Sequence, residues 1–351
     1  MAAQSLHVAT ARDWPEATLA ESGFAIGTPE AIDTAVRAGK LKGLHGVVVF
    51  RRGRLAFERY YEGVDQHWGF PLGDITFGPK TMHDLRSVSK SIVSLLYGIA
   101  LAKKLVPPPD APLFAQFPAY GDLTADKSRQ RILVRHALTM TMGLQWDETI
   151  SYADPRNSER EMEAAPDRFR YALNRQVVDE PGAKWVYSGG STVLIARLIE
   201  NGAEQDLFAF ARATLFDPLG IVSVEWVKGT DGVAAAASGL RMIPRDLARI
   251  GQLVADGGRW GRAQLIEKSW LDESFAPRAK AENLDYGFQW WLGKLRTGKS
   301  WVAGFGNGGQ RLFVVPHLDL GIVITAGNYN DPNVWKLPVA VTNIVFDGLK
   351  R

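Results

Sequence analysis

The segment that decides how this 351-residue chain is interpreted is Leu85-Arg86-Ser87-Val88-Ser89-Lys90-Ser91-Ile92-Val93-Ser94-Leu95-Leu96-Tyr97. Its apolar residues predict a helix over residues 87–103. Ser87 stands three residues before Lys90, and no other serine of the chain has a lysine at that spacing. Residues i and i+3 are neighbours on one face of a helix, so the spacing brings a hydroxyl next to an amine.

This pair matches what nucleophilic catalysis by serine requires. The alcohol is a weak nucleophile and needs an adjacent base. Lysine serves as that base once burial and the positive end of the helix dipole lower its pKa, which from about 10.4 to neutrality requires roughly 4 kcal/mol. The Ser87 N–H at the helix start is free to bind an oxyanion. The simpler alternative is a helix-capping serine followed by a solvated lysine.

Composition limits the class of protein. With 46% hydrophobic and 23% charged residues, the chain resembles a soluble globular protein, and its length favours about two domains. No apolar run reaches 18 residues, so no membrane span is expected. Residues 1–12 lack the features of a signal peptide, which predicts a cytoplasmic protein, or a periplasmic or secreted one if a signal peptide has been removed. The absence of cysteine excludes thiol catalysis and disulfides.

The predicted elements alternate in character along the chain. A helix over 29–39 is followed by a hairpin, 47–50 and 55–61, whose turn contains the basic cluster Arg51-Arg52-Gly53-Arg54; we therefore expect no nucleic-acid partner. Further helices are predicted over 132–141, 193–200, 207–215, 244–256 and 342–349, and strands over 287–292, 301–303, 312–315 and 320–325. Strands near both ends with helices between them predict an α+β protein. We place a sheet domain in 1–85 and 280–351, a mainly helical domain in 86–279, and the active site between them.

Two features of the sequence could suggest a nucleotide site or a zinc site, but neither site is expected. Residues 293–300 match a nucleotide-binding Walker A pattern, but four glycines in the next nine residues preclude the helix that a phosphate site needs, so we predict a hairpin turn. None of the six histidines pairs at i+4, so no zinc site is indicated, and His136 is interpreted as structural. We expect no cofactor and no metal.

Two further segments are candidates for the site. Tyr152 lies in a polar loop, and a tyrosine near a lysine ammonium can have its pKa lowered and act as a base, although most loop tyrosines only pack. Gly308-Gly309-Gln310 opens a predicted strand, where glycines allow close approach of a ligand and a backbone N–H can stabilise an oxyanion. The alternative for the glycines is a plain bulge or turn.

Taken together, six segments in this order resemble the serine β-lactamase-like hydrolases. That branch contains class C β-lactamases, D-alanyl-D-alanine peptidases, carboxylesterases and 6-aminohexanoate-dimer hydrolase, and the last subgroup is the most similar. The segments are Ser87-Val88-Ser89-Lys90, residues 132–144, Tyr152-Ala153-Asp154, residues 181–190, residues 238–249 and Gly308-Gly309-Gln310.

The resemblance implies a fold and a set of roles. The fold is β-lactamase/transpeptidase-like: an antiparallel sheet flanked by helices, with a mainly helical domain beside it. Ser87 would be acylated, Lys90 and Tyr152 would share the proton transfers, and the N–H groups of Ser87 and Gln310 would form the oxyanion hole. The residues implied to bind substrate are Asp154, Tyr187, Asn307, Gly308 and Gly309.

Two departures from the class C pattern narrow the expected substrate. Asp154 replaces the asparagine of the Tyr-x-Asn motif, and Asn307-Gly308-Gly309 stands where Lys-Thr-Gly is usual (Arg296-Thr297-Gly298 is nearer in letters but lies in the predicted turn). Losing that lysine removes a charge-assisted contact worth about 1.5–3 kcal/mol to a substrate carboxylate. We therefore expect a serine hydrolase for small esters or amides, with weak β-lactamase and peptidase activity.

The alternatives are a true β-lactamase or D-alanyl-D-alanine carboxypeptidase, and a non-catalytic scaffold that keeps the fold. The expected partner is a small-molecule ester or amide. The oligomeric state and the natural substrate stay open.

Overall fold

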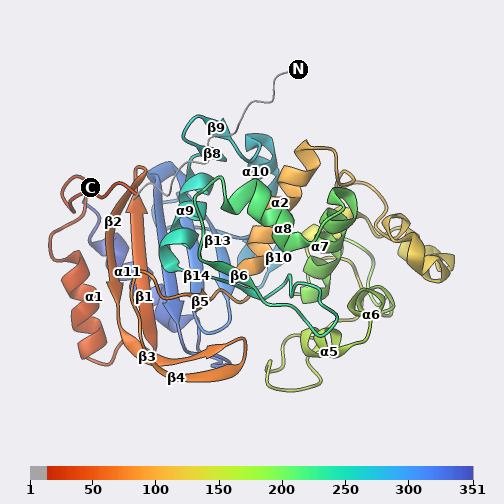
Figure 1. The fold of residues 1–351 in the computed structure, drawn as a ribbon, viewed down its shortest axis with the longest axis horizontal. Coiled ribbons are helices and arrows are strands. Elements are labelled where there is room, and N and C mark those ends of the chain that lie inside the picture. The colour runs from red at the N-terminus through yellow and green to blue at the C-terminus, as the bar shows by residue number, and fades with distance from the viewer. Residues whose placement is uncertain (1–13, 351) are drawn as a thin grey trace.

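The computed structural model describes residues 14–350. Its centre is an eight-stranded antiparallel sheet in the order β10-β11-β12-β13-β14-β15-β1-β2 (Figure 1). The strands are β1 (Leu44–Arg51), β2 (Arg54–Tyr60), β10 (Ala279–Ala281), β11 (Leu284–Tyr286), β12 (Trp291–Lys294), β13 (Ser300–Gly306), β14 (Gln310–Val315) and β15 (Leu320–Ala326). Residues 1–12, which carried the signal-peptide prediction, lie outside the described part.

The sheet joins the two ends of the chain. β1 pairs with β15 in a register that places Val48 opposite Val323. All eight residues of β1 and all seven of β15 are buried, as expected for central strands covered on both faces. The α+β fold class and the antiparallel sheet predicted from the sequence are therefore confirmed.

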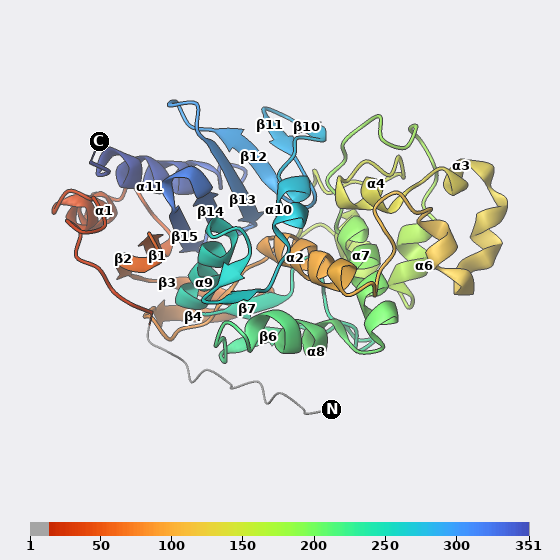
Figure 2. The same ribbon diagram turned by 90° about the horizontal axis from the view of Figure 1, so that it is seen from above.

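Helices cover both faces of the sheet. On one face α1 (Thr28–Arg37) and α11 (Lys336–Asp347) share an apolar cluster with alternate strand residues such as Val47, Val49 and Ile324. On the other face lie α2 (Val88–Ala102) and α9 (Pro244–Ala255) (Figure 2). α9 packs on the sheet although its residues fall in the segment assigned to the helical domain.

The remaining helices gather on the far side of α2 from the sheet (Figures 1 and 2). They are α3 (Lys127–Gln130), α4 (Val134–Leu138), α5 (Ser158–Ala164), α6 (Arg168–Leu173), α7 (Gly189–Ala203) and α8 (Leu207–Ala211), and α10 (Lys268–Ser274) lies at the edge of the sheet. Short helical turns η1 (Phe114–Gln116), η2 (Pro118–Ala125) and η3 (Arg212–Phe216) lie among these helices, and η4 (Pro316–Leu318) lies between β14 and β15.

Small sheets complete the fold. β3 (Glu62–His67) and β4 (Phe70–Thr76) form a hairpin below the main sheet, and β5 (His83–Asp84), β7 (Leu240–Met242) and β6 (Val224–Trp226) form a three-stranded sheet. β8 (Arg259–Trp260) pairs with β9 (Ala263–Gln264). Within residues 14–350 no helix is both long and apolar enough to cross a membrane.

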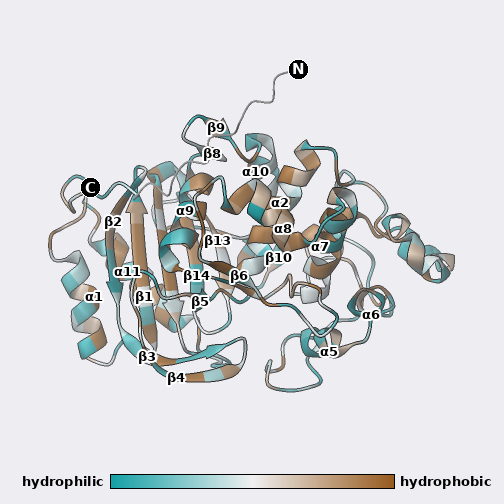
Figure 3. Ribbon diagram, in the orientation of Figure 1, coloured by the Kyte–Doolittle hydropathy of each residue, from teal (hydrophilic) through white to brown (hydrophobic). Residues whose placement is uncertain are grey.

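α2 is central because it is apolar almost all round. Its residues from Val88 to Ala100 are all buried, and Figure 3 shows brown colouring on α2 as on the inner strands. A helix without a polar face has to be enclosed by other elements. α2 contacts α7 on one side and β13 on the other, which fixes its first turn at the junction of the sheet with the helices.

Several local predictions are confirmed and two need correction. The turn at Arg52-Gly53 and the hairpin turn at 295–299 are present between β1 and β2 and between β12 and β13. The helix predicted over 132–141 is only Val134–Leu138, because Met140 takes a left-handed φ of 58°. The strand predicted over 287–292 was wrong in its bounds: the chain bends at Gln289 (φ 63°), whose buried side chain bonds Thr192 and Ala137.

Candidate active site

Ser87 and Lys90 lie together at the buried start of α2. Lys90 Nζ donates to Ser87 Oγ across 3.0 Å, and the two residues are 1% and 8% exposed, respectively. The Ser87 side chain makes no capping hydrogen bond to its helix. The simpler alternative is therefore wrong, because Ser87 does not cap the helix and Lys90 is not solvated.

The charge on Lys90 is set by an acid that the sequence did not reveal. Burial by itself lowers the pKa of Lys90, but the carboxylate of Glu159, 3.2 Å from Nζ, together with Tyr187 and Glu148, holds that pKa above its ordinary value. The lowered pKa expected from burial and the helix dipole is therefore reversed. Nζ also donates to the Ala237 carbonyl across 3.1 Å.

Two tyrosines stand near the pair in different surroundings. Lys90 Nζ lies 4.9 Å from the centre of the Tyr187 ring. Burial raises the pKa of Tyr187, while Lys90 and the Ser87 side chain oppose the rise. The Tyr152 hydroxyl instead donates to Glu148 Oε2 across 2.7 Å, and burial followed by the charge of Glu148 raises the Tyr152 pKa well above its ordinary value.

The segment predicted to supply the second oxyanion donor is the turn between β13 and β14, and the end of β13 lies next to the residues before Ser87. A Cβ on Gly306 would lie 2.4 Å from the Leu85 carbonyl oxygen, so this glycine lets the strand end meet the residues before Ser87. Gly308 and Gly309 have φ of 92° and 103°, a backbone that favours glycine. The Gln310 side chain is bonded to both backbone groups of Ala326 and also donates to the Asn307 carbonyl within the turn.

Two of the residues predicted to bind substrate, Asn307 and Asp154, are held by different partners. Asn307 donates to Asn330 Oδ1 across 2.9 Å and lies beside the glycine turn. Asp154 is paired with Arg156 across 2.7 Å, and the hydrogen bonds from Arg156 lower the pKa of Asp154 to about 2. Asp154 therefore has its charge partner within its own loop.

An aromatic wall stands next to Tyr187. The rings of Trp185 and Trp291 are 5.5 Å apart, and Trp291 stacks on Phe305 at 5.1 Å. Arg311 lies over the Phe305 ring at 4.2 Å, and burial lowers the pKa of this guanidinium to about 10. Trp14, Trp146, Trp226, Trp270 and Trp290 are instead part of the main core.

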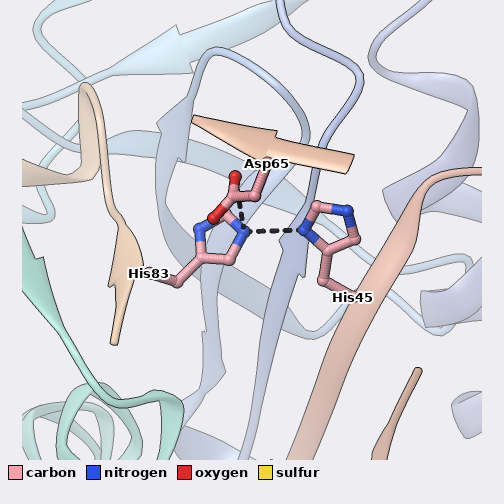
Figure 4. Close-up of side chains that lie close together, drawn as sticks. All are labelled: His45, Asp65 and His83. Carbon is pink, nitrogen blue, oxygen red and sulfur yellow. Dashed lines mark hydrogen bonds and ion pairs between the residues drawn. The ribbon is translucent and has the colours of Figure 1, made fainter. Parts of the chain in front are cut away.

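His45, Asp65 and His83 form a second buried cluster, which the sequence did not connect (Figure 4). His83 Nδ1 lies 2.9 Å from the Asp84 carbonyl and must donate to it, so His83 Nε2 accepts from His45 Nδ1 across 2.9 Å. Burial lowers the pKa of both rings to about 4, which keeps them neutral. A metal bound by these three residues would have to replace the hydrogen bond between the two rings.

This cluster also links the small strands to the site. Asp65 Oδ1 accepts from Tyr329 across 2.8 Å, and Arg86, the residue before Ser87, lies over the Tyr329 ring at 5.0 Å. Arg86 has a left-handed φ of 49°. Such a conformation persists only where the surroundings impose it, and here it sets the turn from which Ser87 starts α2.

Comparisons with known proteins identify the family and the fold. The profile of a family described as "Beta-lactamase" matches residues 30–335. The 6-aminohexanoate-dimer hydrolase of Paenarthrobacter ureafaciens is 23% identical over 285 residues, which cover 73% of this chain and 69% of that protein.

Solved structures share the fold at lower identity. A Bacillus anthracis protein assigned as a 6-aminohexanoate-dimer hydrolase superposes with a TM-score of 0.76 at 17% identity, covering 97% of this chain and 88% of that one. EstCE1, described as a hydrolase with promiscuous acyltransferase activity, superposes with a TM-score of 0.71 at 15% identity, covering 93% and 98%. At such identities these likenesses concern the fold.

Proposed function

Because the chain belongs to the Beta-lactamase family, we propose that it is a serine hydrolase that acylates Ser87 and cleaves small esters or amides. The observation that carries the proposal is the 3.0 Å hydrogen bond between Lys90 Nζ and Ser87 Oγ in a buried first turn. A hydroxyl held against a lysine side chain is placed for activation once that lysine can accept its proton.

The reaction proceeds in two steps. Ser87 Oγ attacks the acyl carbon, and its proton passes to the Lys90 and Tyr187 side chains, which supply a proton to the leaving alcohol or amine. The N–H groups of Ser87 and Gln310 stabilise the oxyanion. Water, activated by the same pair, then releases the acid from Ser87.

The assignment of the tyrosine follows the contacts. The Tyr187 ring lies 4.9 Å from Lys90 Nζ, and Ser87 is among the groups that oppose the rise of the Tyr187 pKa, whereas the Tyr152 hydroxyl donates to Glu148. We therefore propose Tyr187 for the proton transfer and Tyr152 for the wall of the substrate site, a change from the roles that the sequence resemblance implied.

The test uses a p-nitrophenyl acyl ester. Ser87→Ala is expected to lose essentially all turnover and to form no fluorophosphonate adduct by intact-mass measurement, whereas the unaltered protein gains one adduct. Wild-type turnover in Ser87→Ala would refute the proposal, and an unaltered protein that takes no adduct would favour a non-catalytic scaffold.

A β-lactamase or D-alanyl-D-alanine carboxypeptidase is the second candidate, because the family profile takes its name from the first of these activities. Against it stands Asn307, a neutral side chain where a lysine would meet the substrate carboxylate. We expect a chromogenic cephalosporin to be turned over much more slowly than the best ester. Comparable rates would favour the second candidate.

A further inference from the structure

Two glutamates lie directly behind the Ser87–Lys90 pair. We propose that Glu159 and Glu148 are positioning residues of the hydrolytic centre: Glu159 takes up the proton that Lys90 must release before it accepts the proton of Ser87, and Glu148 holds Glu159 in place. This inference rests on the proposed function, since it concerns the same nucleophile.

All three protons of the Lys90 ammonium are engaged in hydrogen bonds. An ammonium has three protons and no lone pair. Nζ places them on three acceptors: Ser87 Oγ at 3.0 Å, Glu159 Oε2 at 3.2 Å and the Ala237 carbonyl at 3.1 Å. Lys90 therefore cannot receive the Ser87 proton until one of its own has left. Of the three acceptors, the carboxylate is the only strong enough base to take it.

The fold holds Glu159 where it can do so. The residue is the second of α5, is 5% exposed, and its N–H is capped by Asn157 Oδ1 across 3.0 Å. A Cβ on residue 189 would lie 2.4 Å from Glu159 Oε2, so Gly189 leaves room for the carboxylate to approach Lys90. Burial opposes the charge on Glu159, but Lys90 and hydrogen bonds from Ser238 and Glu148 keep its pKa below the ordinary value.

Glu148 completes a pair of carboxyl groups. Its Oε1 accepts from Trp146 Nε1 at 2.6 Å and from the Gly189 N–H at 2.5 Å, and its Oε2 accepts from Tyr152. Burial and the neighbouring Glu159 raise the pKa of Glu148, against Lys90. Gly189 brings the two carboxyl groups together, since its N–H donates to Glu148 Oε1 and a Cβ on it would lie 2.4 Å from Glu159 Oε2. Two buried carboxyl groups this close do not both ionise, so Glu148 carries the proton and Glu159 the charge. One shared proton leaves the pair with a single negative charge, which balances Lys90.

The attack then conserves atoms and charge. Ser87 Oγ bonds to the acyl carbon, and the carbonyl π electrons move onto the oxygen. The Ser87 proton passes to Lys90 Nζ while Nζ gives one proton to Glu159 Oε2. The negative charge moves from Glu159 to the oxyanion, and Lys90 stays an ammonium. When the oxyanion collapses, the leaving group takes a proton from Lys90 through Tyr187, and Glu159 returns its proton to Lys90.

The experiment compares two buried glutamates of the same helix. Glu159→Gln keeps the size of the side chain but removes the proton acceptor. Glu163→Gln is the matched control, since Glu163 is also largely buried on α5 but contacts Arg168 at 3.0 Å. Stopped-flow measurement of the p-nitrophenol burst reports acylation. We expect Glu159→Gln to slow acylation about 100-fold or more with KM changed by less than about threefold, and Glu163→Gln to stay close to wild type.

The outcomes separate this inference from the proposed function. If Ser87→Ala is inactive but Glu159→Gln acylates at the wild-type rate, the glutamate inference is overturned and the serine hydrolase stands. If Ser87→Ala remains active, the function itself fails. Circular dichroism checks that Glu159→Gln is folded. Should it not fold, Glu159→Asp is compared instead: its shorter carboxyl is expected to acylate slowly, and a wild-type rate contradicts the inference.

Discussion

At the residue scale, the site is defined by which groups can hold a proton next to Ser87. Lys90 alone does not decide this, because Glu159 keeps it an ammonium. The second group is a tyrosine, and the chain offers two. Tyr187 follows residues 181–186 in a segment that leads into α7, whereas Tyr152 lies in the loop before α5. The Tyr187 ring faces Lys90, and the Tyr152 hydroxyl donates to Glu148.

Replacing each tyrosine with phenylalanine tests the assignment. Tyr187→Phe is expected to lower kcat for the p-nitrophenyl ester about 100-fold or more, because it removes a general acid–base group. Tyr152→Phe removes a hydroxyl bonded to Glu148 and is expected to lower kcat by about tenfold or less, with the larger change in KM. Steady-state kinetics on both variants decides the order, and a larger loss in Tyr152→Phe would restore the role that the resemblance implied.

At the element scale, α2 holds the site rigidly because other elements enclose it. Trp270 of α10 packs against α2, donates from Nε1 to the Ser94 carbonyl across 2.9 Å, and covers Gly98. A Cβ on Gly98 would lie 2.0 Å from the Trp270 ring. The glycine is therefore a requirement of this packing although it weakens the helix itself.

Gly98→Ala is expected to destabilise the protein by about 1–3 kcal/mol, the usual effect of overpacking. Without the clash, alanine would stabilise a helix interior by roughly 1 kcal/mol. Gly121→Ala in η2 is the control, since nothing lies within 4 Å of the added Cβ. Urea denaturation gives the free energy of unfolding of both variants. A Gly98→Ala protein as stable as wild type would show that α10 can move away from α2 without destabilising the fold.

At the scale of the whole molecule, two helices far apart in the sequence, α5 and α9, each carry an acidic side chain whose pKa is raised by burial. Glu163 lies 3.0 Å from Arg168, but neither of its carboxyl oxygens accepts a hydrogen bond. Burial raises the pKa of Glu163 to about 7. On α9, burial raises the pKa of Asp246 to about 6 against the nearby Arg249. Folding thus favours the protonated form of both acids.

A raised pKa in the folded protein gives a definite pH dependence. The folded state binds more protons than the unfolded state between the two pKa values, so this contribution is complete below about pH 4.5 and is lost as the pH rises through about 7. Glu163→Gln cannot ionise, and its free energy of unfolding relative to wild type is expected to increase from pH 5 to 8, by roughly 3 kcal/mol at most.

Urea denaturation at a series of pH values checks this expectation. Glu161→Gln, an exposed position two residues earlier in α5, is the control and is expected to follow wild type. A constant difference between Glu163→Gln and wild type would mean that Glu163 is already ionised throughout.

The amino-acid sequence determined the elements whose cause is local. Runs of apolar residues predicted α2 and α9, and the runs of β-branched residues predicted β1, β14 and β15, because neighbours along one helix or strand are fixed by spacing. The same spacing predicted that Ser87 and Lys90 would share a helix face. For the glycines at 308 and 309 the sequence left two possibilities open, close approach of a ligand or a plain turn, and both residues have a positive φ that favours glycine.

Only the tertiary structure decided which distant groups meet at the nucleophile. Glu148, Glu159, Tyr187 and the His45–Asp65–His83 cluster come from segments that no spacing relates to α2, and a loop glutamate has no local pattern that separates it from a surface charge. The same holds for the charge of Lys90: the sequence could place the amine next to Ser87, but its pKa depends on the carboxylate that packing brings to 3.2 Å from Nζ. Local spacing thus placed Ser87 beside Lys90, and long-range packing decided which groups surround that pair.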